Sequence, residues 1–155
     1  MMEFAVRTGQ LPVLQWLHTN RPEGCTTYAM DEAASIDRLD IIQWLHENRR
    51  EGCTTNAIVN AALHGYLNIV KWLRTHYDEK CTKTAMDVAA RFGHLEIVKW
   101  LHTNCSEGCT AYAMDDAAAY GYLNVVRFLH ENRSEGSSSA AMRDASINGR
   151  LDVVR

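Results

Sequence analysis

The stretch Leu95-Glu96-Ile97-Val98-Lys99-Trp100-Leu101-His102 decides the fold, because similar stretches recur along the whole chain. Each of them begins with a leucine, and successive leucines stand 28 residues apart. The other copies are residues 11–18, 39–46, 67–74, 123–130 and the truncated 151–155. A fixed period of about 20 to 50 residues is typical of proteins in which similar units stack on one another. The sequence therefore predicts a repeat array.

One repeat predicts two helices, and the copy from Cys25 to Gly52 shows the pattern well. The first helix should begin near Thr26 or Thr27, because a threonine hydroxyl can accept a free backbone N–H group of the first turn. It should end at a glycine, which tolerates the left-handed backbone that closes a helix. These glycines are Gly9, Gly65, Gly93, Gly121 and Gly149. Asp37 replaces the glycine in one copy, so we expect a strained turn there.

The second helix carries an apolar stripe that is too wide for a helix with a single neighbour. In one copy the stripe comprises the rows Leu39, Ile42, Leu45 and Ile41, Trp44, Asn48. We expect this helix to be buried against its own first helix and against the repeats on both sides. The repeated aromatic residues, Trp16, Trp44, Trp72, Trp100 and Phe128, could form a stacking platform for bases or peptides. Their place on this helix instead favours the core between repeats.

These patterns predict an all-α fold, a helical-repeat solenoid of about five and a half helix–turn–helix units. We expect one domain over residues 1–155, with units at 1–24, 25–52, 53–80, 81–108, 109–136 and 137–155. The first and last units are incomplete, which indicates a piece of a longer array. Uncapped terminal units leave end-to-end self-association open, because array ends normally carry a polar outer face.

The composition is typical of a folded, soluble domain. The chain is 46% hydrophobic and 23% charged, and its formal net charge is −3. That charge argues weakly against a general nucleic-acid binder. The sequence has no apolar run long enough for a membrane span, and its first residues do not resemble a signal peptide. We therefore expect an intracellular protein, either cytoplasmic or nuclear.

The five cysteines favour reduced thiols. Cys25, Cys53, Cys81 and Cys109 share one repeat position. Stacked helices would hold them about 8–10 Å apart, which exceeds the distance that a disulfide can bridge. Cys105 stands outside this register, four residues before Cys109, and the sequence leaves their pairing open.

No constellation of residues predicts catalysis, a cofactor or a metal. The histidines His18, His46, His102 and His130 form a ladder with one member per repeat, whereas metal ligands must converge on one ion. The adjacent carboxylates Asp31-Glu32 and Asp115-Asp116 point in different directions on a helix. Asp31, Asp87 and Asp115 share one repeat position early in the first helix, where they should stabilise the helix start. We therefore expect a protein that is not an enzyme.

With the repeat in register, the chain resembles the ankyrin repeat family. The segment Arg91-Phe92-Gly93-His94-Leu95-Glu96-Ile97-Val98-Lys99 is similar to the family's Gly-His-Leu-Glu-Val-Val segment, and alanine pairs such as Ala89-Ala90 match its first helix. Two features depart from the family pattern. Aspartate usually replaces the family's first-helix histidine, and the unit is about five residues shorter than the usual ankyrin repeat. Since the missing part falls where ankyrin repeats project a β-hairpin, we expect an array without such fingers.

Positions that differ between the copies are the candidates for binding. Several of them lie four, seven and eight residues apart on the first helix, which places them on one face opposite the alanine pair. The resemblance implies that this side forms the groove that holds a protein or peptide. The candidate binding residues are Tyr28, Glu32, Ile36, Asn60, Leu63, His64, Val88, Arg91, Phe92, Tyr112, Asp116 and Tyr120. Solvent-facing positions also vary when nothing constrains them, although so many exposed aromatic residues favour binding.

Charge divides the two helices. The first helices carry the aspartates, whereas the second helices carry the row Lys71, Lys99, Arg127 and Arg155. An acidic groove would suit a basic or amphipathic peptide. Two alternatives stay open: a nucleic-acid-binding array that uses the basic row, and a passive scaffold or spacer.

Overall fold

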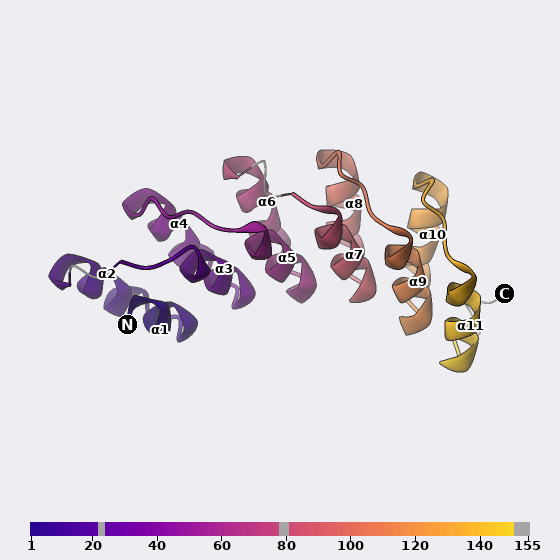
Figure 1. Cartoon of the computed structure of the whole chain (residues 1–155), viewed down its shortest axis with the longest axis horizontal. Helices are drawn as coiled ribbons and strands as arrows, with labels where there is room; N and C mark the ends of the chain where they lie inside the picture. Colours follow the sequence, from indigo (N-terminus) through magenta and orange to yellow (C-terminus); the bar gives the residue numbers. More distant parts are fainter. Residues whose placement is uncertain (22–23, 78–80, 151–155) are drawn as a thin grey trace. The chain divides into compact units, whose positions relative to one another are not determined.

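The structure is a computed structural model, and it describes residues 1–21, 24–77 and 81–150 (Figure 1). These residues form eleven helices and no strand, so the all-α repeat fold without β-hairpin fingers is confirmed for them. The first helices are α1 (Met2–Arg7), α3 (Tyr28–Ser35), α5 (Thr55–His64), α7 (Lys83–Arg91), α9 (Ala111–Tyr120) and α11 (Ser139–Ile147). The second helices are α2 (Leu11–Asn20), α4 (Leu39–Asn48), α6 (Leu67–His76), α8 (Leu95–Asn104) and α10 (Leu123–Asn132). The last copy of the leucine stretch, residues 151–155, lies outside the described residues.

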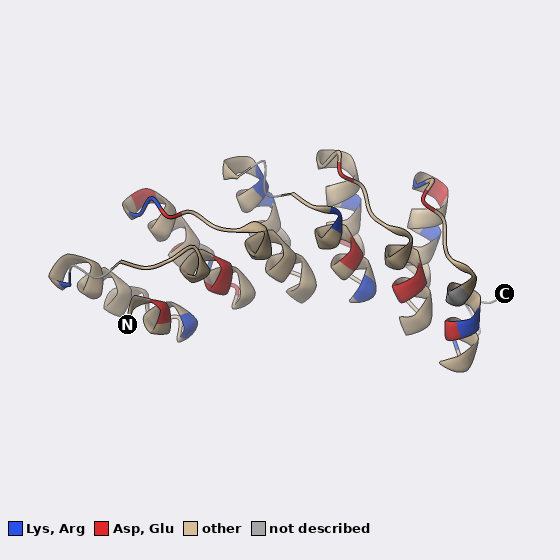
Figure 2. Ribbon diagram, viewed as in Figure 1, with Lys and Arg blue, Asp and Glu red and all other residues tan. Residues whose placement is uncertain are grey.

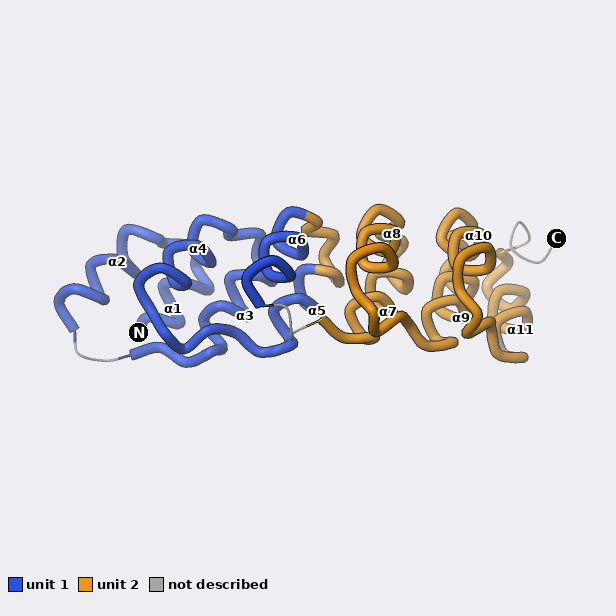
Figure 3. The backbone as a smooth tube through the Cα atoms, turned by 90° about the horizontal axis from the view of Figure 1, so that it is seen from above, with its two compact units in different colours: residues 1–61, 68–80 blue, residues 62–67, 81–155 orange. Residues whose placement is uncertain are grey.

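The chain divides into two compact units, shown in different colours in Figure 3. The N-terminal unit comprises residues 1–61 and 68–80, and the C-terminal unit comprises residues 62–67 and 81–155. Within the N-terminal unit α1 packs against α3, and within the C-terminal unit α9 packs between α7 and α11. Each of α1, α3, α7 and α9 also packs against the second helix of its own repeat. None of the helices in the described part of the chain is long and apolar enough to cross a membrane.

The core uses the copied positions of both helices. The alanine pairs, Ala33-Ala34 for example, are fully buried, and their small side chains let neighbouring helices approach closely. Each second helix contributes aliphatic residues to the core, as Ile97, Val98 and Leu101 do in α8. Burying one such side chain contributes roughly 1.5–3 kcal/mol to folding. The positions whose side chains are buried are therefore among those that every repeat copies.

The turn between the two helices needs a left-handed residue and close packing. Gly93 has φ 76°, and a β-carbon at this residue would lie 2.6 Å from the ring of Tyr122, which belongs to the next repeat. His94 likewise contacts the preceding repeat, because its Nε2 lies 3.0 Å from the carbonyl oxygen of Leu63. Asp37 has φ 57°, and it is the only non-glycine residue with positive φ in the described part of the chain. The strained turn predicted at Asp37 is thus confirmed.

Where a repeat carries an aspartate at the position of Asp31 and Asp87, the aspartate connects it to the next repeat. Asp87 Oδ1 accepts a hydrogen bond from the backbone N–H of Thr110 at 2.8 Å, and its Oδ2 accepts one from the Thr110 hydroxyl at 2.9 Å. The Thr110 hydroxyl oxygen in turn accepts the backbone N–H of Tyr112 at 3.2 Å. Asp31 binds Thr54 in the same way. The aspartates therefore stabilise a helix start, as expected, but it is the start of the following repeat's first helix rather than of their own.

The tryptophans do not lie in the core, so that prediction is wrong. Trp16 is 57% exposed, and Trp44, Trp72 and Trp100 are half-buried. The buried places on the second helix are taken by the aliphatic residues, which leaves the indole at the edge of the helix. There a histidine from the preceding repeat meets the ring edge-on. The ring centroids of His18 and Trp44 are 5.2 Å apart, and those of His102 and Phe128 are 5.5 Å apart.

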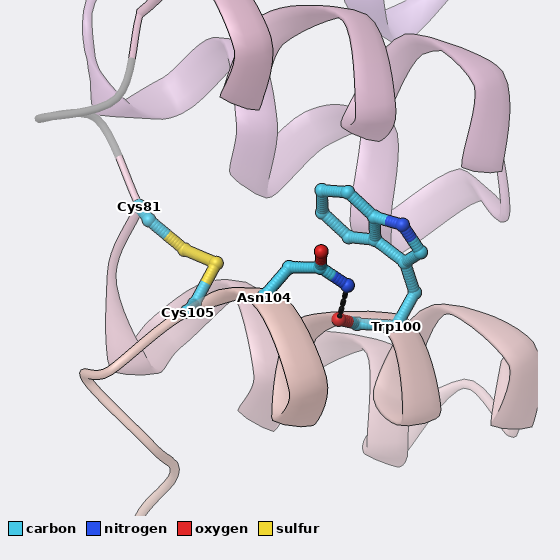
Figure 4. Close-up of a disulfide and its surroundings, with 4 residues drawn as sticks. All are labelled: Cys81, Trp100, Asn104 and Cys105. Carbon is cyan, nitrogen blue, oxygen red and sulfur yellow. Dashed lines mark hydrogen bonds between the residues drawn. A yellow bond between two sulfur atoms is a disulfide. The ribbon is translucent and has the colours of Figure 1, made fainter.

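Cys81 and Cys105 form a disulfide (Figure 4), so the prediction that all cysteines are reduced is wrong. Their Cα atoms are 6.6 Å apart, within the range that a disulfide bridges. The repeat register explains the pairing, because Cys105 stands where other repeats carry Arg49 and Arg133. Those arginines lie beside the repeated cysteines Cys25 and Cys109. A cysteine in the arginine position therefore meets the thiol of Cys81.

Cys25 and Cys109 carry free thiols, so Cys105 does not pair with Cys109. Burial raises the pKa of both free thiols, with a smaller contribution from Glu51 at Cys25 and from Glu135 at Cys109. Since the thiolate is the nucleophilic form, neither group is activated for chemistry.

Candidate interaction surface

The twelve candidate binding residues all reach the protein surface, and none of them is buried. Six are exposed: Tyr28, His64, Arg91, Phe92, Tyr112 and Tyr120. Six are half-buried: Glu32, Ile36, Asn60, Leu63, Val88 and Asp116. They divide between the units, with Tyr28, Glu32, Ile36 and Asn60 in the N-terminal unit and the others in the C-terminal unit. Each unit therefore carries its own part of the candidate surface.

The part in the N-terminal unit surrounds Tyr28, at the start of α3. Tyr28 is 50% exposed, and the Glu32 carboxylate one turn later raises the pKa of its hydroxyl. Together with residues of α1, Tyr28 lines a surface hollow of about 260 Å³. Phe4 in that hollow is 61% exposed, and the guanidinium carbon of Arg7 lies 5.6 Å from its ring centroid.

Phe4 and Arg7 were missed by sequence reasoning. The 28-residue register places Phe4 at the same position as Glu32 and Asp116, and Arg7 at the position of Arg91. Extending the comparison of variable positions to the truncated first repeat would have found both. Asn60 is a different case, since its Nδ2 donates to the backbone carbonyl of Asp31 at 3.2 Å. Its amide therefore also takes part in packing between repeats.

The part in the C-terminal unit gathers around the end of α7. The guanidinium carbon of Arg91 lies 5.9 Å from the ring centroid of Phe92 and 5.9 Å from that of Tyr120. Phe92 and Tyr120 are 45% and 46% exposed, and Tyr122, which the sequence did not single out, is 37% exposed. One cation therefore lies beside two solvent-facing aromatic rings, and the ring centroid of Tyr122 lies 6.5 Å from that of Tyr120.

The repeated aspartates do not make this surface acidic. Asp31 and Asp115 are buried, and Asp87 is half-buried with both carboxylate oxygens bonded to Thr110. Figure 2 shows red segments in the middle of α7 and α9. Asp87 and Asp115 in these segments accept hydrogen bonds from the next repeat. The prediction that they supply an acidic groove is therefore wrong. Glu32 and Asp116 remain as half-buried acids of the candidate set.

Asp116 is poorly solvated. Desolvation by burial raises the pKa of its carboxyl group, and the charges of Asp115 and Asp87 add to the effect, whereas Arg91 opposes it. Near neutral pH this acid gains little from the solvent around it. The Arg91 guanidinium, by contrast, is exposed.

The basic row of the second helices lies elsewhere. Lys71, Lys99 and Arg127 are exposed, while Arg155 lies outside the described residues. Lys99 Nζ is 2.9 Å from a carboxylate oxygen of Glu96. Because this acid offsets one of the three described cations, the row offers little to a nucleic-acid backbone.

One cluster of metal-ligand residue types exists within residues 1–21, 24–77 and 81–150. Its members are Cys81, Cys105 and Glu107, whose ligand atoms lie within 4.8 Å of one another. The two sulfurs are bonded to each other, so they do not bind a metal in this form. The ladder histidines do not join any such cluster in the described residues.

Comparison with protein families gives one match. The family described as ankyrin repeats, in three copies, matches residues 30–115, which is more than half of the chain. No curated protein matches the sequence.

Proposed function

This chain belongs to the ankyrin repeat family, and we propose that it binds a protein partner, without catalysis, through the variable face of its first helices. Ankyrin repeats are generally protein–protein interaction modules. One observation carries the proposal for this chain: every candidate residue on that face reaches solvent, whereas the alanines opposite are buried. Side chains that a fold does not need, but that include several exposed aromatic rings, are typical of a binding surface.

Aromatic residues make this face suitable for a protein rather than for a small polar ligand. Phe4, Tyr28, Phe92, Tyr112 and Tyr120 are each at least 45% exposed. Aromatic and arginine side chains dominate the energetics of protein interfaces because they bury much apolar surface and retain a polar group.

A capture experiment tests the proposal. The chain is immobilised, and bound proteins from a cell extract are compared between the native chain and the double variant Phe92→Ala/Tyr120→Ala. We expect the variant to lose its specific partner, because truncating two central aromatic residues typically weakens an interface by about 2 kcal/mol or more. Circular dichroism should confirm that the variant remains helical.

Trp16→Ala is the matched control, because Trp16 is also an exposed aromatic residue but lies on a second helix. If the double variant retains every partner, the proposed surface is not the binding site. Loss of partners in Trp16→Ala alone would assign binding to the second helices. A chain that captures no specific partner would instead fit a passive spacer.

Nucleic-acid binding through the basic row is the weaker alternative. It predicts retention on DNA or RNA that declines steeply as salt is raised. We expect little retention at physiological salt, because the net charge is −3 and Lys99 pairs with Glu96.

A further inference from the structure

We infer that the surface formed by Arg91, Phe92, Tyr120 and Tyr122, here called the Arg91 patch, binds an acidic peptide segment that carries an apolar anchor residue. The inference rests on the proposed function and makes it more specific, because it names the chemistry of the partner. It also differs from the basic partner that the sequence suggested, since the aspartates expected to attract a basic peptide bind the next repeat.

Charge is the first argument. Arg91 is exposed at the end of α7, and it forms no salt bridge within the described residues. Asp87 binds Thr110 and Asp115 binds Ser138, so these carboxylates are directed at the next repeat, whereas Asp116 interacts electrostatically with Arg91 without forming a salt bridge. An exposed guanidinium that forms no salt bridge can form two parallel hydrogen bonds to one carboxylate of a ligand. A basic peptide would instead meet this cation directly.

Preorganisation is the second argument. The rings of Phe92 and Tyr120 both lie 5.9 Å from the Arg91 guanidinium carbon, so each ring restricts the arginine side chain. Restricting a long arginine side chain before binding lowers the conformational entropy lost when it pairs.

Shape is the third argument. Immediately after Phe92, the turns that follow α7 and α9 line a hollow of about 280 Å³. Its walls include Gly93, Leu95, Tyr122, Leu123 and Val125. The hollow is open, and its size suits one apolar side chain rather than a drug-sized ligand. The hollow begins at Gly93, two residues after Arg91, and Leu95, Tyr122 and Leu123 give it apolar walls beside the polar Asn124.

Selection from a random peptide library displayed on phage tests the inference, because the natural partner need not be known. The full chain serves as bait, and the recovered peptides are sequenced. We expect enrichment of Asp or Glu beside Leu, Phe, Tyr or Trp. Affinities of the enriched peptides are then measured by fluorescence anisotropy. Arg91→Ala should weaken binding about tenfold or more, since a hydrogen bond to a charged group is lost.

Two further variants make the result specific. Arg91→Lys keeps the charge but loses the planar fork and the stacking on the rings, so its binding should fall between that of the native chain and that of Arg91→Ala. Arg143→Ala removes an equally exposed arginine on α11, one that already pairs with Asp144, and should leave binding unchanged.

Each outcome decides a separate question. Enrichment of Lys- or Arg-rich peptides, or acidic peptides that bind Arg91→Ala as tightly as the native chain, would overturn the acidic-segment inference while leaving the proposed function standing. If the enriched peptides bind Phe92→Ala/Tyr120→Ala as tightly as they bind the native chain, the Arg91 patch is not their binding site. A selection without any enriched sequence would count against both the acidic-segment inference and the proposed function.

Discussion

At the scale of single residues, contacts with a neighbouring repeat limit which side chains a position can accept, even where the helix itself would accept several. Gly93 illustrates this restriction, because its left-handed backbone and the ring of Tyr122 each exclude a side chain. Gly149 has the same repeat position and φ 69°, but a β-carbon there would meet no atom of the described residues within 4 Å. Comparing substitutions at these two glycines therefore distinguishes the cost of backbone strain from the cost of crowding by Tyr122.

Gly93→Ala should lower the free energy of unfolding by about 2–4 kcal/mol, combining left-handed strain with displacement of the Tyr122 ring. Gly149→Ala should cost only about 1 kcal/mol, because strain acts there alone. Urea denaturation followed by circular dichroism measures both. Equal losses in the two variants would show that crowding by Tyr122 is unimportant.

A charged pair at the residue scale should make stability depend on pH. Glu135 binds Arg133, and this hydrogen bond lowers the pKa of the carboxyl group from 4.5 to about 2. A carboxyl group whose pKa is lower in the folded state stabilises the fold above its unfolded pKa. That stabilisation is lost as the pH falls from about 4.5 toward 2.

Glu135→Gln should therefore be less stable than the native chain at neutral pH. Because the pair is partly solvent-exposed, we expect a difference of at most about 1 kcal/mol. The difference should vanish as the pH approaches about 2, where Glu135 becomes protonated. Urea denaturation across this pH range provides the measurement, and Glu131→Gln, an exposed acid on α10, is the control. A difference that does not change with pH would exclude the Arg133 pair as its cause.

At the scale of helices, the ends of each second helix are fixed by copied contacts. Asn104 Nδ2 donates to the backbone carbonyl of Trp100 at 2.8 Å (Figure 4), and Asn20 does the same to Trp16. These bonds satisfy a carbonyl in the last turn, where intrahelical partners run out. The Cys81–Cys105 disulfide then connects the residue that follows α8 to the turn that precedes α7.

Reduction should weaken this repeat. The disulfide spans 24 residues, and closing a loop of this size should stabilise the folded chain by roughly 3 kcal/mol through the unfolded state. Thermal unfolding with and without a thiol reductant tests this expectation. Cys105→Ser should match the reduced native chain and should not respond to reductant, whereas Cys25→Ser should still respond. A native chain that is indifferent to reductant would contradict a stabilising disulfide.

At the scale of the whole molecule, stability in repeat proteins is approximately a sum of local terms, because each repeat contacts only its neighbours. Tryptophan fluorescence can report in which unit a substitution changes the stability. Trp100 is the only tryptophan in the sequence of the C-terminal unit, whereas Trp16, Trp44 and Trp72 belong to the N-terminal unit. Phenylalanine is a suitable replacement, since Phe128 occupies the same position naturally.

We expect Cys105→Ser to move the urea midpoint reported by Trp100 more than the midpoint reported by Trp44. The comparison uses two single-tryptophan chains, in each of which the other three tryptophans are replaced by phenylalanine. The corresponding chains with Cys105 intact provide the reference midpoints. Identical shifts at both reporters would show that the whole chain unfolds as one cooperative body.

The sequence by itself determined the period, the two helices of each repeat and the left-handed turn at Asp37. Its resemblance to ankyrin repeats, combined with the shorter unit, also predicted the absence of β-hairpin fingers from the described residues. Local rules fix these features, and five or more copies of one pattern make the rules easy to read. The sequence also identified a face whose twelve candidates all reach solvent, since variable positions are those that the core does not use.

Only the tertiary structure decided which side chains meet between repeats. Comparing the chain with itself at 28 residues aligns the residues that occupy the same position in each repeat. The contacts between repeats instead join residues that occupy different positions. Asp31 meets Thr54 across 23 residues, Cys81 meets Cys105 across 24, and His94 meets Leu63 across 31. These contacts bury Asp31 and Asp115, bring Cys81 and Cys105 within disulfide distance and leave Arg91 exposed beside two aromatic rings. The physical reason is that pairing depends on the direction and reach of each side chain in the stack, which the repeat register does not specify.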